Sequence, residues 1–345
     1  MSATGAAVRR TMWLSWAYLI AVTLLALAFW AWADSWWPLT VLLFGPRWLL
    51  LLPLFGLIAA AVKYARRSLV PLGLALIIVA GPTMGFRTGW RSWFTGGDSV
   101  RSIRVVTYNV AGGRRLRLSA SWIMEELRAD IIAFQECGSG IAAAIADLSE
   151  VAVAHDIHGS LCLVSRFPIV AAAEMERENL EFAGGSGLVV RYTIEAPGQN
   201  IRLTNVHLDT PRAGLERIRG GDVAAGQRQL LTKTALREIE SRLARRWAEA
   251  VSGPFLVVGD FNTPVESVIY RRYWGDLRNA FSYAGFGFGS TRFNGWIRVR
   301  IDHILASDGW QVQRAFVGPN FGSDHRPVVA DLIPPEEDVR TADLN

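Results

Sequence analysis

Beyond about residue 102, short apolar segments repeatedly end in a carboxylate, an amide or an imidazole. The polar residues at these ends are Asn109, Glu136, His207, Asp260, Asn262, Asp302, Asp324 and His325. Oxygen ligands with few nitrogens and no thiolates suit a hard cation such as Mg²⁺ or Mn²⁺ better than zinc. A single Asn or Asp after a strand is usually a turn former, but this repetition favours one catalytic site assembled at strand ends.

Other kinds of catalytic site lack their sequence signatures. The chain has no Cys and His spacing typical of zinc, no glycine-rich phosphate loop opening a helix and no Gly-x-Ser-x-Gly elbow. These absences leave a metal site built from oxygen ligands at strand ends as the interpretation of the polar set.

The elements that must position these residues follow from the apolar pattern. Strands are expected at residues 103–109, 131–135, 160–165, 188–193, 201–207, 255–259, 302–305 and 328–332, and helices at 121–129, 140–148 and 224–250. Many short apolar strands interspersed with helices predict a mixed α/β sandwich. In such sheets catalytic groups collect at strand ends, because the sheet holds them rigidly.

The polar motifs also occur in a distinctive order. In chain order they are Asn109, Glu136, Ser165-Arg166-Phe167-Pro168, His207, Gly259-Asp260-Phe261-Asn262, Ile301-Asp302-His303 and Ser323-Asp324-His325. This order resembles the endonuclease/exonuclease/phosphatase superfamily, which includes DNase I-like nucleases and neutral sphingomyelinases. The resemblance covers residues 103–333 and implies metal-assisted in-line attack of water on a phosphodiester. The polar set fits that reaction, which needs neutralised phosphoryl oxygens, an aligned water and a stabilised leaving oxygen. The fold implied by the resemblance is a DNase I-like, four-layer α/β/β/α sandwich with its site at one end of the paired sheets.

The resemblance also implies a metal site. Glu136 would be the principal Mg²⁺ ligand, with Asn109 beside it and Asp324 near the metal. Mn²⁺ is the alternative ion. Some members of the superfamily have a further acidic residue two positions after the first Asn, where this chain has Ala111. This departure leaves open whether one or two ions bind.

Five further residues take catalytic roles by the same resemblance. Asp260 would orient or deprotonate the attacking water, and Asn262 would donate to the phosphoryl oxygens. His325, held by Asp302, and His207 would contact the scissile phosphate. A neighbouring carboxylate favours the imidazolium form, so we interpret His325 as a charge stabiliser and Asp260 as the base.

The first hundred residues have a different composition. Apolar runs at residues 11–33, 48–62 and 68–86 are long enough to cross a bilayer, so residues 1–95 are interpreted as a transmembrane anchor. Arg9 and Arg10 precede the first run and a basic loop separates the other two, which places both on the cytoplasmic side. The catalytic domain is then extracytoplasmic on a multi-pass protein of the inner membrane. A cleaved signal peptide in place of the first span gives the same topology.

The charge distribution bears on the substrate. The net charge is +5, yet residues 1–100 hold eight Lys or Arg and two Asp or Glu, whereas residues 101–345 hold 28 and 29. The excess therefore lies in the anchor. Arg212 and Arg300 are candidate substrate-phosphate contacts in two arginine-rich segments. A phospholipid-type headgroup, DNA or RNA and an inactive binding domain remain as alternatives, and no obligate protein partner is expected.

The remaining segments carry little chemistry. Residues 96–102 are expected to be a linker and residues 334–345 a disordered acidic tail. Cys137 and Cys162 can pair in an oxidising compartment or remain as buried thiols on strands.

Overall fold

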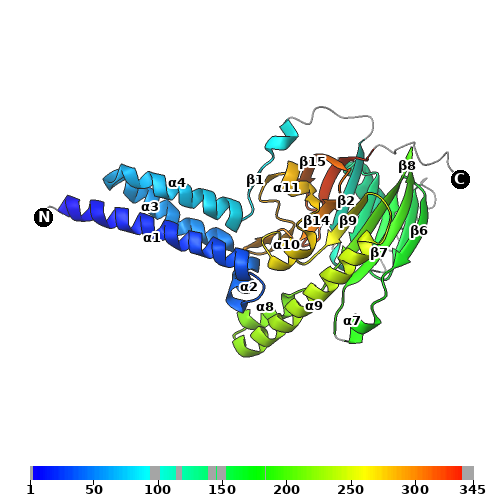
Figure 1. Ribbon diagram of the computed structural model, residues 1–345, viewed down its shortest axis with the longest axis horizontal. Coiled ribbons are helices and arrows are strands. Elements are labelled where there is room, and N and C mark those ends of the chain that lie inside the picture. The colour runs from blue at the N-terminus through cyan, green and yellow to red at the C-terminus, as the bar shows by residue number, and fades with distance from the viewer. Residues whose placement is uncertain are drawn as a thin grey trace.

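The computed structural model describes residues 3–93, 102–113, 119–138, 145, 153–182 and 184–335. Apolar helices project from one side of an α/β domain built on two packed sheets (Figure 1). The expected helix at 140–148, linker at 96–102 and tail at 334–345 fall almost entirely outside the described residues.

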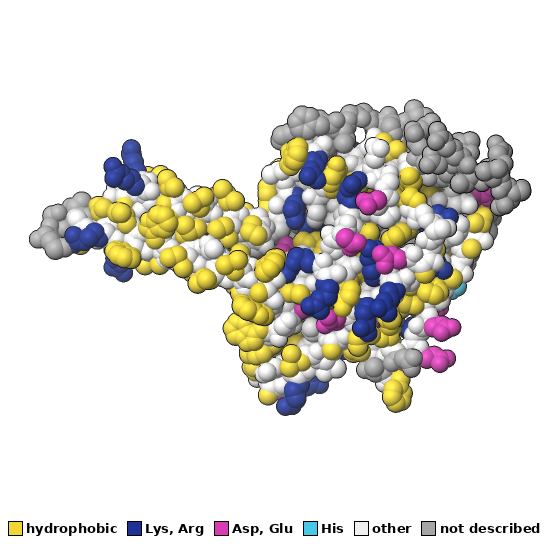
Figure 2. All heavy atoms as spheres, in the orientation of Figure 1, with side chains coloured by type: hydrophobic (Ala, Val, Ile, Leu, Met, Phe, Trp, Pro, Cys, Tyr) yellow, Lys and Arg dark blue, Asp and Glu magenta, His cyan; other side chains and the backbone are white. Residues whose placement is uncertain are grey.

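The projecting helices match the expected membrane spans. Stretches long and apolar enough to cross a membrane are Gly5–Trp32, Arg47–Tyr64 and Arg66–Thr83. Their helices are α1 Ala3–Trp32, η1 Arg47–Leu50 with α3 Leu51–Tyr64, and η2 Arg66–Ser68, α4 Leu69–Ile78 and η3 Val79–Thr83. Hydrophobic side chains cover the projection, and Lys and Arg lie at its far end (Figure 2). A short helix that the sequence pattern does not predict, α2 Trp37–Phe44, links the first two spans.

Two six-stranded sheets form the centre of the α/β domain. The first, in the order β10-β14-β9-β8-β7-β6, comprises Arg278–Asn279, Asp302–Ala306, Phe255–Asp260, Gln199–His207, Leu188–Ala196 and Ile169–Glu174. The second, in the order β15-β16-β2-β3-β5-β4, comprises Gln311–Val317, Val328–Ile333, Ile103–Asn109, Ile131–Gln135, Leu161–Ser165 and Ala154–His158. Two further two-stranded sheets are added: β1 Arg87–Thr88 pairs with the distant β11 Phe286–Gly287, and β12 Arg292–Asn294 forms a hairpin with β13 Ile297–Val299.

Helices cover the outer faces of the two sheets. They are α5 Ala120–Glu126, α7 Glu178–Phe182, α9 Val223–Glu249 and α10 Val268–Trp274. Of the other helices, α8 Arg212–Arg219 packs on α9, and α11 Ala280–Ala284 packs into the core between the sheets. Ile123 of α5 packs on the second sheet, and Ala244 of α9 and Trp274 of α10 pack on the first. Val105 and Leu203 belong to the core between the sheets. The predicted α/β/β/α sandwich is thus confirmed.

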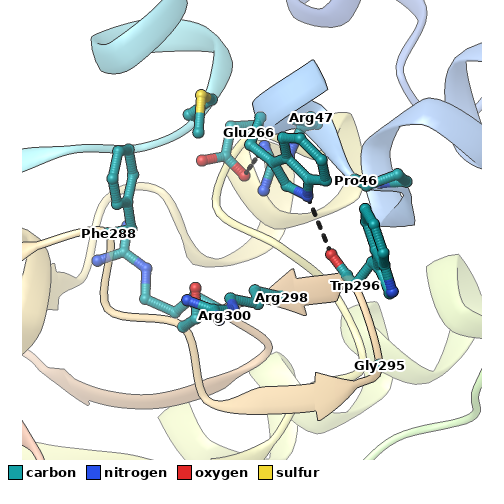
Figure 3. A pocket seen from close by; sticks show the side chains of 11 residues that line it. Pro46, Arg47, Glu266, Phe288, Gly295, Trp296, Arg298 and Arg300 are labelled. Carbon is teal, nitrogen blue, oxygen red and sulfur yellow. Dashed lines mark hydrogen bonds and ion pairs between the residues drawn. The ribbon is translucent and has the colours of Figure 1, made fainter. Parts of the chain in front are cut away.

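The helical bundle and the α/β domain are joined by buried polar contacts. Asp34, just after α1, accepts a hydrogen bond of 2.6 Å from Ser267 Oγ at the start of α10. Arg47 Nη1, at the start of the second span, lies 3.1 Å from Glu266 Oε2 (Figure 3). The same nitrogen donates to the Thr83 carbonyl at 2.7 Å. These contacts fix the ends of the spans to the domain.

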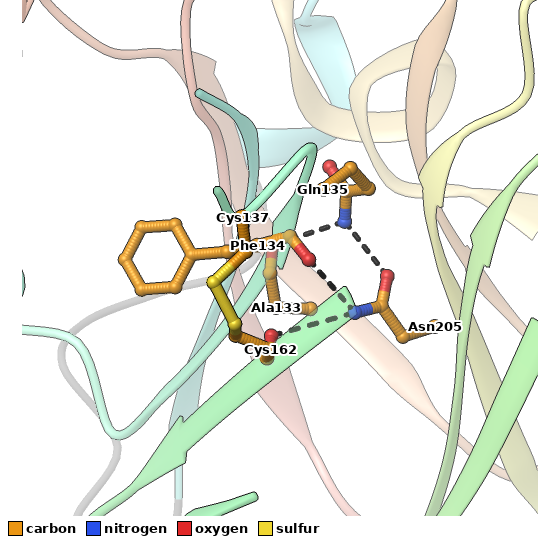
Figure 4. The surroundings of a disulfide bond; sticks show 6 residues. All are labelled: Ala133, Phe134, Gln135, Cys137, Cys162 and Asn205. Atoms are coloured by element: carbon orange, nitrogen blue, oxygen red, sulfur yellow. Dashed lines mark hydrogen bonds between the residues drawn. A yellow bond between two sulfur atoms is a disulfide. The ribbon is translucent and has the colours of Figure 1, made fainter. Parts of the chain in front are cut away.

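A disulfide and an amide network lie beneath one end of the sheets. Cys137 and Cys162 form a disulfide with a Cα–Cα distance of 6.1 Å, which resolves the alternatives left open by the sequence (Figure 4). Gln135 Nε2 of the second sheet donates to Asn205 Oδ1 of the first at 2.7 Å. Buried amides that satisfy each other add directional contacts to an apolar interface, so they help to set how one sheet sits on the other.

Candidate active site

Strand register brings the predicted polar residues to one end of the two sheets. In the first sheet, His207 of β8 and Asp302 of β14 are the two cross-strand partners of Asp260 at the end of β9. In the second sheet, Asn109 ends β2, and Glu136 directly follows β3, its parallel neighbour. The site therefore consists of adjacent strand ends from both sheets.

Asn109 joins the two halves of the site. Its Nδ2 donates to Glu136 Oε1 at 3.1 Å and to Asp260 Oδ2 at 3.0 Å. The backbone N–H of Ala111 donates to Asn109 Oδ1 at 2.9 Å, so this amide has its nitrogen toward the carboxylates. One side chain thus sets the spacing between the carboxylates of Glu136 and Asp260.

Asp260 is a buried carboxylate with a raised pKa. Burial raises its pKa most, and the Asp302 charge raises it further, while His325, His207 and the Asn262 N–H work in the opposite direction. Asp260 Oδ2 lies 3.8 Å from His325 Nε2 and 3.9 Å from His207 Nε2, and Oδ1 accepts from Asn262 N at 2.8 Å. A carboxylate of raised basicity in this position suits the abstraction of a proton from water.

His325 is held by Asp302 and faces Arg292. Its Nδ1 lies 2.8 Å from Asp302 Oδ2, and both side chains are fully buried. Burial lowers the pKa of His325, but the charge of Asp302, their hydrogen bond and the charge of Asp260 outweigh this and raise it to about 9. Arg292 Nη1 lies 2.8 Å from His325 Nε2, a contact that only the neutral ring can accept. In the imidazolium form, two donors converge at this point, where an anionic oxygen can accept from both.

The backbone around the site is held in uncommon conformations. Ala111, Glu136 and Asn262 have φ values of 50°, 52° and 47°, in the left-handed region that non-glycine residues rarely adopt. A Cβ on Gly259, which has φ 144°, would lie 1.9 Å from the Val206 carbonyl oxygen. Such conformations cost about 1–3 kcal/mol each and tend to cluster at functional sites.

The donor set fits a divalent cation. The Glu136 side chain is 43% exposed, so its carboxylate is accessible, and Asp324 Oδ1 is buried without a hydrogen-bond partner among the described residues. Asp260, Asp302 and His325 also offer ligand atoms within 4.8 Å of one another. That group is fully buried, and Asp302 already holds the His325 ring, so Glu136 is the more open anchor for an ion.

Of the two candidate substrate arginines, the structure brings only Arg212 close to the site. Its pKa is raised mainly by a hydrogen bond to Glu216, partly offset by burial, and further by charges that include Asp324 and Glu136. Arg300 is 4% exposed and lines a different cavity, with Arg47 and Glu266 (Figure 3). Arg300 therefore does not take part in this cluster of strand-end residues.

Arg292 is the residue that the sequence-based set misses. Its Nη2 lies 2.8 Å from Asp324 Oδ2 while Nη1 contacts His325. The sequence feature that could have indicated Arg292 is its position in the arginine-rich segment before Asp302. Spacing alone, however, does not favour Arg292 over Arg298 or Arg300.

A cavity of about 110 Å³ opens beside these residues. Asn262, Arg292 and Arg212 are among its lining residues. Its apolar wall includes Leu215 of α8 and Phe44 of α2. We call this space the catalytic pocket. Its wall thus includes a residue from the helical bundle.

Comparison with known proteins identifies the family and the fold. The endonuclease/exonuclease/phosphatase family matches residues 106–325, and no curated protein sequence matches the chain. The structure of D. rerio TDP2 with a single-strand DNA product has a TM-score of 0.52 at 12% identity, covering 68% of this chain and 99% of that one. Truncated Caenorhabditis elegans TDP2 has a TM-score of 0.50 at 16% identity, covering 67% and 98%. Since the family match covers more than half of its length, the chain belongs to the endonuclease/exonuclease/phosphatase family of phosphoester hydrolases.

Proposed function

We propose that the protein is a membrane-anchored, Mg²⁺-dependent phosphodiesterase that hydrolyses a phospholipid-type headgroup at the outer surface of the membrane. The observation that carries this proposal is the composition of the catalytic pocket. Its lining arginines, Arg212, Arg219 and Arg292, outnumber its one lining carboxylate, Glu216, which pairs with Arg212. Phe44, Leu215 and Ile297 supply an apolar wall. A ligand with a phosphodiester and an acyl chain matches both surfaces.

The position of the pocket supports a lipid substrate further. Phe44 belongs to a hydrophobic cluster that includes Phe29 of α1, Leu43 of α2, and Val299 and Ile301 of the α/β domain. The pocket wall is thus continuous with the end of the first apolar span. Because the chain leaves the membrane there, a headgroup in the outer leaflet has a short path to the pocket.

Glu136, Asn109 and Asp324 are the residues that would hold the ion. Bound there, Mg²⁺ would neutralise charge on the phosphoryl oxygens as a Lewis acid. The exposed carboxylate of Glu136 and the unpartnered Oδ1 of Asp324 support this assignment. Oxygen donors favour Mg²⁺ over zinc, with Mn²⁺ as the alternative.

The chain's own residues supply the proton transfer and the remaining charge. Asp260 takes the proton of the attacking water, because burial makes its carboxylate more basic than usual. Asn262 donates one amide hydrogen to the Leu208 carbonyl at 2.8 Å, which leaves the other for a phosphoryl oxygen. His325, positioned by Asp302, provides a further donor to the phosphoryl group. These positions agree with the roles that the family resemblance implies.

A nuclease is the second candidate. Arg212, Arg219 and Arg292 line the pocket, and a basic rim suits a phosphate backbone. The D. rerio TDP2 structure contains a single-strand DNA product. The α/β domain is nearly neutral in sequence, however, and a nucleic-acid backbone offers no apolar chain to contact the apolar wall. We therefore place the lipid first.

The proposed orientation rests on charge and on the disulfide. Lys63, Arg66 and Arg67 lie at the adjoining ends of the second and third spans, which favours a cytoplasmic position for that turn. The Cys137–Cys162 disulfide suits an oxidising compartment. Both observations support a domain outside the cytoplasm, with the anchor in the inner membrane.

The test is the hydrolysis of a panel of substrates by the full chain in detergent. The panel comprises sphingomyelin, phosphoinositides, duplex DNA, RNA and bis-p-nitrophenyl phosphate, each with Mg²⁺ or EDTA and with the Asp260→Asn variant as control. We expect Mg²⁺-dependent cleavage of dispersed lipid that the variant lacks. Cleavage of nucleic acid alone would replace the lipid by the second candidate, and metal-independent activity would contradict the mechanism.

A further inference from the structure

A second cavity lies where the helical bundle meets the α/β domain. Its volume is about 500 Å³, and its walls come from the start of the second span, the end of the third span and the β12–β13 hairpin (Figure 3). The residues that concern us are Arg47, Trp48, Glu266, Trp296, Arg298 and Arg300. We call this space the junction pocket.

The junction pocket has an excess of positive charge. Its charged lining residues are Arg47, Arg298, Arg300 and Glu266. Arg47 and Glu266 form an ion pair of 3.1 Å, so the single carboxylate already has a close partner. Two arginines are therefore left without a carboxylate of their own among the lining residues.

Arg300 is the most unusual of these residues. It is 4% exposed, and Nε, Nη1 and Nη2 all lack a hydrogen-bond partner among the described residues. Its guanidinium lies 5.0 Å from the ring centre of Phe281. Burial lowers its pKa to about 10, and the Glu266 charge opposes this, so it stays protonated at neutral pH. A buried cation without hydrogen-bond acceptors is costly unless an anion joins it.

The junction pocket and the catalytic pocket lie on opposite sides of one strand. Successive residues of a strand point to opposite faces. Ile297, Val299 and Ile301 line the catalytic pocket, whereas Trp296, Arg298 and Arg300 line the junction pocket. The two pockets share no lining residue. Arg300, the residue after the end of β13, therefore lies on the same side as Arg298 and away from the catalytic pocket.

The position and the walls of the junction pocket suit the headgroup region of a bilayer. Arg47 begins the second apolar span, and Met84 directly follows the third. Trp48 of the span stacks on Trp296 of the hairpin with ring centres 5.7 Å apart, and Trp48 Nε1 donates to the Trp296 carbonyl. Tryptophan is typical of the membrane interface, where an apolar body and a polar edge are both satisfied.

We propose that the junction pocket binds the phosphate of an anionic phospholipid, held by Arg298 and Arg300, as a non-catalytic site that fixes the domain to the bilayer surface. The phosphate supplies the acceptors that Arg300 lacks, and the acyl chains leave along the apolar faces of the adjoining spans. This proposal does not depend on the substrate of the catalytic pocket. It holds equally if that pocket cleaves nucleic acid.

The test is lipid binding to the full chain, in an Asp260→Asn background that prevents turnover. The probe is a photoactivatable phosphatidylglycerol in detergent micelles, with crosslinked residues mapped by mass spectrometry and affinity taken from titration. We expect crosslinks near Arg47 or Trp296, and about tenfold weaker binding for Arg300→Gln, the loss of a charge-assisted contact. Arg314→Gln, at an exposed arginine of the same domain, is the matched control and should bind normally.

Folding is checked with two further measurements. Arg300→Gln removes an unpartnered buried cation, so its Tm without lipid should not fall below that of the parent. Arg298→Gln alters an exposed residue and should weaken binding without affecting Tm. Unchanged affinity in both variants, or crosslinks confined to Phe44 and Leu215, would overturn the proposal. Inorganic phosphate that competes as well as the lipid would also overturn it, since the site would then take a free anion.

Discussion

The two pockets on either side of the β12–β13 hairpin differ in whether the charged groups around them have hydrogen-bond partners. In the active site beside the catalytic pocket, the main catalytic groups hold one another: Asp302 holds His325, and Asn109 holds both Glu136 and Asp260. In the junction pocket, Arg300 has no hydrogen-bond partner among the described residues. The difference indicates two kinds of function. Chemistry requires groups fixed before the substrate arrives, whereas a buried cation without acceptors suits a site completed by its ligand.

The largest effect is expected in the active site, at Asp260 and His325. Asp260→Asn removes the carboxylate that accepts the proton, and His325→Ala removes a phosphoryl donor. Each change should lower kcat at least ~100-fold, the usual scale of general acid–base catalysis. Steady-state kinetics measure this, with Asp308→Asn, at an exposed carboxylate, as control. Near-normal turnover in either purified variant would show that the paired groups are not the catalytic ones.

The next largest effect concerns the metal. EDTA should abolish activity, and Glu136→Gln should weaken the apparent affinity for Mg²⁺ roughly tenfold or more, because a neutral amide replaces the most accessible carboxylate. A Mg²⁺ titration of activity measures this for the variant and the parent. If the variant responds to Mg²⁺ like the parent, then the ion binds at the buried group of Asp260, Asp302 and His325 instead.

A smaller effect is expected at Arg292, which lies on β12 and lines the catalytic pocket. Arg292→Gln removes a contact to His325 and one to Asp324, and kcat/KM should fall about tenfold, with most of the loss in KM. Arg314→Gln again serves as the control. Equal kinetics for the two variants would mean that the catalytic side of the hairpin does not contact the phosphate.

The smallest effect tests the apolar wall. Leu215→Ser should raise KM for dispersed lipid roughly fivefold, about 1 kcal/mol of lost apolar contact, and change KM for bis-p-nitrophenyl phosphate less. The ratio of the two KM changes is the informative quantity. A ratio of one would remove the support that the wall gives to a lipid substrate.

Burial explains which strands could be predicted from the sequence. Interior strands such as β3 and β9 are nearly continuous apolar runs buried on both faces, and the sequence predicts each of them. The edge strands β4, β6, β10 and β15 were missed. An edge strand such as β15 carries the exposed Arg314 and half-buried residues, so its pattern resembles a loop.

The site was predictable for a related reason, and only in part. Asn109, Asp260 and Asp302 stand at ends of interior strands, so their convergence follows from the sheet. Ile297, Val299 and Ile301 alternate with Arg298 and Arg300 in the sequence, but the pairing of β12 with β13, which places Arg292 on the catalytic side, is not visible there. The position of Phe44 in the wall of the catalytic pocket depends on how α2 packs on the α/β domain, which the local sequence does not predict.

The central claim is that a metal-dependent phosphodiesterase site faces the membrane. The most direct measurement is the rate of headgroup release from lipid in vesicles that contain the reconstituted full chain, with Mg²⁺, with EDTA and with Asp260→Asn. We predict release with Mg²⁺ that both EDTA and the substitution abolish. Vesicle lipid that stays intact under all three conditions, while DNA or RNA in the same tube is cleaved, would contradict the claim.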